Sequence, residues 1–396
     1  MVLRGLILFL MALGFFYNSE CQDLTTLNHF IMTGIYGSFM VVSLGLTMEA
    51  GLDIHTEIFI ETNFIILAIA SYYPLLYCVI DLYKTADEII VSPGGPSDHP
   101  LNISPDSSWS TYFKDNEVLL QIDKDVRRLC PDISFFQTAT EYPCLEIVYS
   151  NGVKRLHRRV QQQVLRFSTL ERRGLGVAKL SNENRRSDMH NGDYAPLTEG
   201  REAHWEVVER MLFLYAKLNP GQGYVQGMNE IIGPIYHTFA IDPDKEFRKH
   251  AEADCFFCFT NLMAEIRDFF IRTLDESTSG INYVMCKLSD CLKKNDPMVW
   301  NMLDVQELRP QYYSFRWLTL LLSQEFSLPD LERIWDTLFA DAERFDFLIY
   351  ICCAMILVRH EILHGDFASN VKLLQNFPPM DVSLILNKAL EISKNR

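Results

Sequence analysis

Residues 219–230 read Asn219-Pro220-Gly221-Gln222-Gly223-Tyr224-Val225-Gln226-Gly227-Met228-Asn229-Glu230. Pro220, Gly221 and Gly223 predict the end of a helix followed by a tight, exposed turn, because proline and glycine do not continue a helix. Gly227 permits the close approach of a second backbone, since it carries no side chain. A glutamine displayed on such a turn, Gln226, can hold a water molecule in a fixed position.

The sequence on the N-terminal side of this turn has the periodicity of amphipathic helices. Apolar residues recur at steps of three and four in two segments, Leu119, Ile122, Val126 and Leu129 in the first and Trp205, Val208, Leu212 and Tyr215 in the second. Strand-like alternation flanked by turn dipeptides is scarce. We therefore expect an all-α fold with many helices.

A second motif lies in the first of these segments, which reads Ile122-Asp123-Lys124-Asp125-Val126-Arg127-Arg128 and has the form I-x-x-D-x-x-R. Asp125 and Arg128 fall on neighbouring turns of a helix, so the carboxylate can orient the guanidinium while Ile122 anchors the segment in the core. By itself, the pattern also fits an ordinary surface ion pair on an amphipathic helix.

A third motif lies nearer the C-terminus. It comprises Arg316-Trp317-Leu318, then Leu321, Leu322, Glu325 and Phe326, and finally Arg333-Ile334-Trp335-Asp336. We expect Trp317 and Trp335 to be packing residues. Arg316 and Asp336 are expected to form a buried ion pair between helices, with a structural role.

Taken together, the three motifs resemble those of the TBC-domain family of Rab GTPase-activating proteins, over roughly residues 99–394. The second motif matches the family's I-x-x-D-x-x-R, and the turn matches its Y-x-Q-G-M-N from Tyr224 to Asn229. The third motif is similar to the family's R-W-L and W-D stretch. The resemblance implies a helical TBC domain.

The resemblance also implies a mechanism. Arg128 would enter the nucleotide site of a GTP-bound Rab protein, and Gln226 would align the attacking water in place of the GTPase's own glutamine. Asp125 would hold Arg128, while Tyr224, Gly227 and Asn229 would shape the glutamine loop. The Rab protein binds GTP and Mg²⁺ itself, so the resemblance implies no cofactor and no metal site in this chain, which would be an activator and not itself an enzyme.

Two features depart from the family pattern. Leu129 follows Arg128, where the family usually has threonine. TBC domains also begin with helices that carry a G-[IV]-P-x-x-x-R and tryptophan pattern upstream of the arginine motif, and apolar runs occupy that stretch here. The second departure leaves an alternative open, namely a membrane-tethered adaptor that binds a Rab protein without accelerating hydrolysis.

Composition divides the chain into three parts. Residues 1–91 form a hydrophobic N-terminal segment, and residues 92–110 are rich in proline, glycine and serine, as expected of a linker. We place the TBC domain at residues 111–396. Within it, residues 172–200 are polar and charged and predict an exposed loop.

Three apolar runs occupy the N-terminal segment, Leu6–Tyr17, Phe30–Leu46 and Phe64–Ile80. The second and third approach the length of about 20 residues that crosses a bilayer. The first is shorter and fits a signal peptide, a hydrophobic anchor or a buried helix. The acidic segment between the second and third runs carries no lysine or arginine, which favours a position outside the cytosol. Cleavage of a signal peptide conflicts with a cytosolic domain, so the topology stays open, and we expect the domain at the cytosolic face of an internal membrane.

The charge and the cysteine content argue against several classes of partner and of structural site. The formal net charge of −15, from 36 basic and 51 acidic residues, opposes general binding to nucleic acid or anionic lipid and favours a protein partner. The ten cysteines are irregularly spaced, and several lie within apolar runs, which indicates free thiols in a reducing compartment. Cys255 and Cys258 lack the second CxxC of a four-cysteine zinc site.

One motif of another class lies near the C-terminus. His360-Glu361-Ile362-Leu363-His364 fits the H-E-x-x-H pattern of zinc peptidases, in which two histidines one helical turn apart bind the metal. No histidine follows His364, so the third ligand would have to be Asp366, Asp381 or Glu391. The alternative is a solvated helix end that stops at Gly365.

Overall fold

The structure is a computed structural model that describes residues 72–77, 99, 102, 104, 107–149, 155–159, 195–198, 200–271, 274–275, 277 and 280–394. The first two apolar runs, most of the expected linker and the expected loop up to residue 194 lie outside these residues. The chain divides into two compact units, one ending at Phe257 and the other beginning at Cys258. Within the described ranges the regular structure is helical, and the only β pairing is an isolated bridge between Ala139 and Ala203. The expected all-α fold is confirmed.

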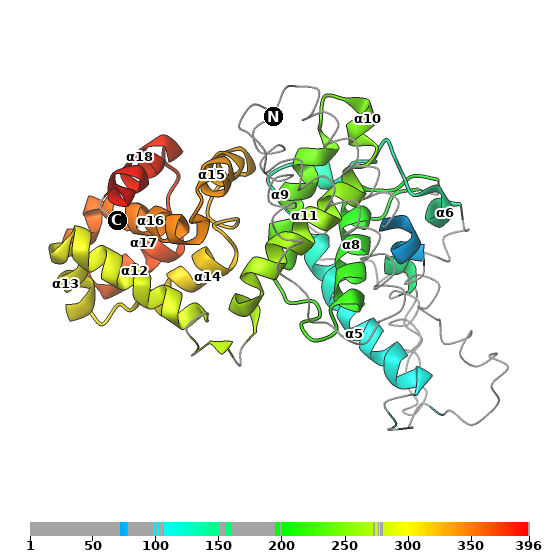
Figure 1. Ribbon diagram of the computed structural model, residues 1–396, viewed down its shortest axis with the longest axis horizontal. Helices are drawn as coiled ribbons and strands as arrows, with labels where there is room; N and C mark the ends of the chain where they lie inside the picture. The colour runs from blue at the N-terminus through cyan, green and yellow to red at the C-terminus, as the bar shows by residue number, and fades with distance from the viewer. Residues whose placement is uncertain are drawn as a thin grey trace, which may run out of the picture. The chain divides into compact units, whose positions relative to one another are not determined.

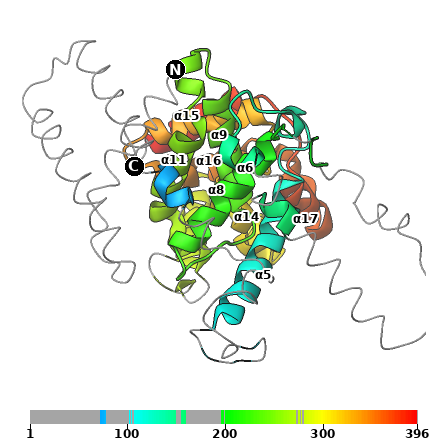
Figure 2. The same cartoon turned by 90° about the vertical axis from the view of Figure 1, so that its right-hand side faces the viewer.

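The described part of the N-terminal unit is helical, and α5 is its longest helix (Figure 1). Its named elements are α5 (Ser108–Val126), η1 (Phe135–Gln137), α6 (Leu145–Val148), α8 (His204–Leu218), α9 (Met228–Ala240), α10 (Lys245–Arg248) and the start of α11 (Ala251–Ile266). Figure 2 shows α5 alongside α8, against which it packs. The two helices run antiparallel, because Asp115 of α5 accepts from Lys217 at 2.8 Å while Arg127 lies over the Trp205 ring.

The apolar stripes of α5 and α8 explain this pairing. Leu119, Ile122 and Val126 are fully buried on α5, as the spacing of three and four residues predicts. The first turn of α5 is capped by Ser107, whose hydroxyl accepts from the Ser110 amide. On α8, the Glu206 carboxylate accepts from the Ala203 amide at 2.7 Å, which satisfies an amide at the start of that helix.

Residues 72–77, from the third apolar run, form a helical segment in the N-terminal unit. Tyr72 and Leu76 are buried in its core, and the Tyr72 ring lies 5.2 Å from that of Phe256 on α11. Residues 72–77 of the Phe64–Ile80 run thus contribute to the core of this unit, and the rest of the run lies outside the described residues. Among the residues that the structure describes, no helix is both long and apolar enough to cross a membrane.

The C-terminal unit is built around one apolar helix, α16 (Arg344–Leu357), against which α12, α14, α15 and α18 pack. Its other named elements are η3 (Arg267–Phe270), α12 (Ile281–Asn295), α13 (Pro297–Val305), η5 (Pro310–Tyr312), α14 (Ser314–Thr319), α15 (Leu328–Ala340), η6 (His360–His364), α17 (Phe367–Gln375) and α18 (Val382–Ser393). Asp296, Asp366 and Asp381 cap α13, α17 and α18 by accepting hydrogen bonds from amides of their first turns.

The third motif lies in this unit, where Trp317 and Trp335 are fully buried. The predicted Arg316–Asp336 pair is wrong, because the Arg316 guanidinium instead donates to both carboxylate oxygens of Glu325, at 2.6 and 3.0 Å. The chain reverses at two consecutive residues of positive φ, Leu321 and Leu322, and this reversal returns Glu325 to Arg316.

Candidate functional site

Arg128 stands at the C-terminal end of α5, immediately after the capping residue Arg127. Its side chain is 55% exposed, whereas Ile122 on the same helix is fully buried. The Arg128 Nε donates to the Lys124 carbonyl at 3.1 Å, and its Nη2 donates to Asp125 Oδ1 at 3.4 Å. The guanidinium is thus restrained at its base and remains open to solvent.

Asp125 is the buried carboxylate that restrains Arg128. While Oδ1 accepts from Arg128, Oδ2 accepts from the Tyr224 hydroxyl at 2.8 Å. Burial raises the pKa of Asp125 above its usual value, although the hydrogen bond from Tyr224 and the charge of Arg128 act in the opposite direction. Asp125 therefore connects the arginine motif with the turn at residues 219–230.

Tyr224 and Asn229 hold that turn against α5. Burial, with the charge of Asp125 adding to it, raises the pKa of Tyr224 well above its usual value, so its hydroxyl stays a donor at neutral pH. The hydroxyl also lies 3.4 Å from Asn229 Oδ1. The Asn229 side-chain amide donates to the Asp125 carbonyl at 3.5 Å and to Glu230 Oε1 at 2.9 Å.

Gln226 lies two residues after Tyr224 and is exposed. Gly227 follows with a φ of 104°, a left-handed conformation that favours glycine, and α9 begins at the next residue. Gln222 accepts a hydrogen bond from the Tyr215 hydroxyl at 2.8 Å, which ties the start of the turn to the end of α8. The turn is therefore anchored at both ends and exposes its glutamine.

The N-terminal unit thus brings together the first two motifs: Ile122, Asp125, Arg128, Tyr224, Gln226, Gly227 and Asn229. The residues of the third motif belong to the other unit and make packing contacts there. The Trp335 indole, for example, donates to the Leu321 carbonyl at 2.8 Å and fastens the chain reversal.

Arg127, the neighbour of Arg128, has a structural environment that the motif does not reveal. Its Nε donates to Asp123 at 2.8 Å, and its guanidinium lies 4.5 Å from the centre of the Trp205 ring. Arg127 is buried, so the two consecutive arginines point to different surroundings. The sequence does contain a signal for the ion pair between Arg127 and Asp123. Asp123 lies four residues before Arg127, a spacing that suits an ion pair within a helix.

Buried charges continue along α8. Arg155 donates to Glu206 at 2.8 Å, and His157 Nδ1 lies 3.2 Å from the same carboxylate. Burial and the positive charges of the surrounding arginines lower the pKa of His157 to about 3, so its imidazole is neutral at physiological pH. Burial raises the pKa of Glu209, on the following turn of α8, well above its usual value.

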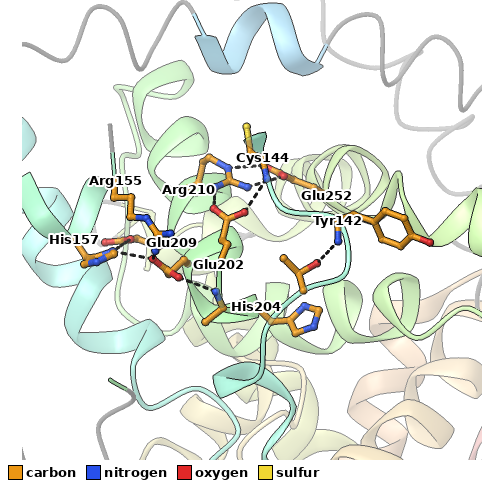
Figure 3. Close-up of polar contacts among 12 residues, drawn as sticks. Tyr142, Cys144, Arg155, His157, Glu202, His204, Glu209, Arg210 and Glu252 are labelled. Carbon is orange, nitrogen blue, oxygen red and sulfur yellow. Dashed lines mark hydrogen bonds and ion pairs between the residues drawn. The ribbon is translucent and has the colours of Figure 1, made fainter. Parts of the chain in front are cut away.

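A second buried network is centred on Arg210 (Figure 3). Its guanidinium donates to both oxygens of Glu252 on α11, at 2.7 and 2.8 Å, and also to Glu202. Glu202 accepts from the Cys144 amide at 2.9 Å, and Glu252 accepts from the Tyr72 hydroxyl at 2.6 Å. The network joins α8, α11, the segment at Cys144 and residues 72–77. Sequence spacing does not reveal it, because its members are far apart in the chain.

The exposed position of Arg128 and Gln226 bears on the kind of partner. Two cavities, of about 260 and 270 Å³, lie in the C-terminal and N-terminal units respectively. Neither is lined by Arg128 or Gln226. Arg128 and Gln226 are both exposed and therefore accessible to a partner.

The H-E-x-x-H segment does not have the geometry that its spacing requires. Residues His360–His364 form the 3₁₀ helix η6, and Gly365 caps it. With three residues per turn, positions four apart lie roughly 120° apart around the axis and do not share one face. Among the described side chains, no three histidine, cysteine, aspartate or glutamate residues are grouped so as to hold a metal ion.

Known proteins resemble this chain over most of its length. The Rab-GTPase-TBC domain family model matches residues 193–363. TBC1 domain family member 13 of Mus musculus is 60% identical over 302 residues, covering 76% of this chain and 76% of that protein. Its Homo sapiens counterpart is 54% identical over 351 residues, covering 84% and 88%. The solved Ypt/Rab-GAP domain of Gyp1p matches 71% of this chain and 94% of its own, with a TM-score of 0.45 and 20% identity. This chain belongs to the TBC-domain family.

Proposed function

We propose that this chain accelerates GTP hydrolysis by a GTP-bound Rab-family GTPase, with Arg128 and Gln226 acting in the partner's nucleotide site. The observation that carries the proposal is the pair of hydrogen bonds to Asp125, one from Arg128 and one from Tyr224. These hydrogen bonds connect the exposed Arg128, and the turn that exposes Gln226, to the same buried carboxylate.

The chemistry of GTP hydrolysis explains what each side chain would contribute. Charge builds up on the phosphoryl oxygens in the transition state, and an arginine supplied by a second protein neutralises it with hydrogen bonds that strengthen as the reaction proceeds. A glutamine amide can both donate and accept, so Gln226 can orient the attacking water. GTP and Mg²⁺ belong to the partner.

The restraint on Arg128 suits this role. Its contact with Asp125 is long, at 3.4 Å, so Arg128 can exchange it for phosphate oxygens when a partner docks. Meanwhile the hydrogen bond to the Lys124 carbonyl limits the orientations of the side chain before docking. Such restraint reduces the entropy lost on reaching the reactive geometry.

Single-turnover GTP hydrolysis across a panel of purified Rab proteins tests the proposal. The wild-type chain is compared with Arg128→Ala and Gln226→Ala, and we expect acceleration of one or a few Rab proteins. Losing an arginine of this kind removes about 10³ to 10⁵ in rate, so Arg128→Ala should approach the intrinsic rate.

Arg267→Ala is the matched control, because the Arg267 side chain is 53% exposed and lies in the other unit. It should leave the acceleration intact. Rab binding without acceleration by the wild-type chain would overturn the proposal and support the adaptor alternative.

We also propose that the chain acts at the cytosolic face of an internal membrane, where GTP-bound Rab proteins are found. The apolar runs Leu6–Tyr17 and Phe30–Leu46 support membrane attachment. An alkaline carbonate wash of cell membranes tests this, since an anchored chain stays in the pellet and a peripheral one is released.

A further inference from the structure

Gly233 lies in the middle of α9 and is buried. A Cβ atom at this position would lie 2.8 Å from Cδ1, 3.2 Å from Cδ2 and 3.3 Å from Cγ of Leu129. All three neighbours belong to the same side chain, and the shortest distance is below van der Waals contact. Glycine is a poor helix former, so the absence of a side chain at this helical position is best explained by the space that Leu129 occupies.

Leu129 carries this contact directly to Arg128. It follows Arg128 in the chain, its side chain is fully buried, and its amide donates to the Val126 carbonyl at 3.3 Å. Cys130 comes next with a φ of 44°, so the backbone changes direction directly after Leu129, in the turn that follows α5. Leu129 is therefore the residue that anchors the chain where Arg128 emerges.

Gly233 is connected to Gln226 through the first turns of α9. The helix α9 begins at Met228, and Gly233 lies about two turns after Gln226 along the chain. A helix transmits a displacement from one turn to the next through its packed backbone and its hydrogen bonds, although Pro234 donates none in α9. Any shift of α9 away from Leu129 therefore moves the start of α9, and the glutamine before it, relative to Arg128.

We propose that Leu129 and Gly233 are positioning residues that set the separation between Arg128 and Gln226. The inference rests on the proposed function and adds a determinant that touches neither GTP nor the partner. Packed interiors yield little, so an added methyl group at Gly233 displaces α9 or Leu129. Such a displacement lowers the rate of hydrolysis, because catalytic groups must lie within a fraction of an ångström of their working positions.

The test is a double-mutant cycle with Gly233→Ala and Leu129→Ala, read out in two ways. The single-turnover rate at saturating chain is measured together with the affinity for the Rab protein bound to a non-hydrolysable GTP analogue. We expect Gly233→Ala to lower the rate at least tenfold while the affinity changes less than twofold. Leu129→Ala removes all three crowded atoms, so the double variant should be faster than Gly233→Ala, whereas Leu129→Ala alone should lower the rate because it removes the anchor.

Ile385→Val controls for loss of stability, because Ile385 is a buried residue of α18 in the other unit. It should leave the rate unchanged at a temperature where urea titration shows every variant to be folded. An unchanged rate in Gly233→Ala, a loss of affinity equal to the loss of rate, or a double variant no faster than Gly233→Ala would each overturn the positioning role alone. A wild-type chain inactive on every Rab protein would refute the proposed function and this inference with it.

Discussion

Asp125 receives hydrogen bonds from both halves of the proposed site, and its ionisation should therefore govern activity. Its pKa is raised by burial, so it becomes protonated at a higher pH than an exposed aspartate does. Protonation removes the negative charge that restrains Arg128. The same raised pKa means that ionised Asp125 costs folding stability at neutral pH, and this cost disappears as the pH falls through the folded-state pKa.

We predict that the accelerated rate of GTP hydrolysis declines on the acid side at a pH above the usual range of aspartate. Protonation of Asp125 should not lower the free energy of unfolding over the same pH range. Asp125→Asn should lower the rate at neutral pH by roughly tenfold to a hundredfold, as expected when a group that orients a catalytic side chain is lost, and should abolish the acid limb. Rates measured against pH, with the Rab protein's intrinsic hydrolysis subtracted, decide the matter. An acid limb that persists in Asp125→Asn would assign the titration to another group.

At the scale of elements, α8 connects most of the N-terminal unit through charged side chains as well as apolar ones. The Arg210 guanidinium donates hydrogen bonds both to Glu202, which precedes α8, and to Glu252 on α11. Removing one partner of a buried ion pair leaves an unpaired charge in a medium that solvates it poorly. The cost is then larger than the net contribution of the intact pair.

Arg210→Leu should consequently lower the free energy of unfolding by about 3–5 kcal/mol. Arg344→Leu is the comparison, because Arg344 also pairs with a glutamate, Glu265 at 2.9 Å, but both side chains are partly exposed. That variant should lose less than about 1 kcal/mol. Urea unfolding of the two variants measures the difference, and equal losses would show that the Arg210 network is solvated.

The hydroxyl of Tyr72 belongs to the same network and offers a milder change. Tyr72→Phe keeps the ring against Phe256 and removes only the hydrogen bond to Glu252. A hydrogen bond to a charged group contributes about 1.5–3 kcal/mol, so the variant should lose stability in that range. Tyr73→Phe, on the neighbouring and less buried residue, should change the unfolding free energy by less than about 0.5 kcal/mol. Equal losses of unfolding free energy in the two variants would show that the Tyr72 hydroxyl does not stabilise the network.

Periodicity predicted the elements better than it predicted their partners. The steps from Leu119 to Val126 identified a buried helical face, because burial of one stripe leaves a regular signal in the sequence. The partner of Arg316 was missed because it depends on a chain reversal at two leucines, residues that do not usually adopt positive φ. The five residues of η6 were expected on an α-helix, since a short segment carries too few turns to distinguish the two periods.

At the scale of the whole molecule, the motifs identified the family, but hydropathy did not decide the role of the N-terminal segment. A run such as Phe64–Ile80 has the composition of a membrane span and equally that of a helix buried on all sides, so composition does not separate them. The buried Tyr72 and Leu76 distinguish the two for residues 72–77. They also supply apolar cover to a unit that lacks the family's usual upstream pattern.

This placement predicts where the working domain begins. A chain of residues 64–396 keeps Tyr72 and Leu76, whereas a chain of residues 92–396, cut at the boundary expected from composition, lacks both. Burying two large side chains and one charged hydrogen bond, less the cost of ordering them, contributes roughly 3 kcal/mol. The N-terminal unit of the shorter chain should therefore unfold about 6–12 °C lower than that of the longer one. Calorimetry of the two chains, with Tyr72→Phe in the longer one as an intermediate case, measures this. Equal unfolding temperatures would mean that residues 72–77 contribute nothing to the domain and that the boundary lies after them.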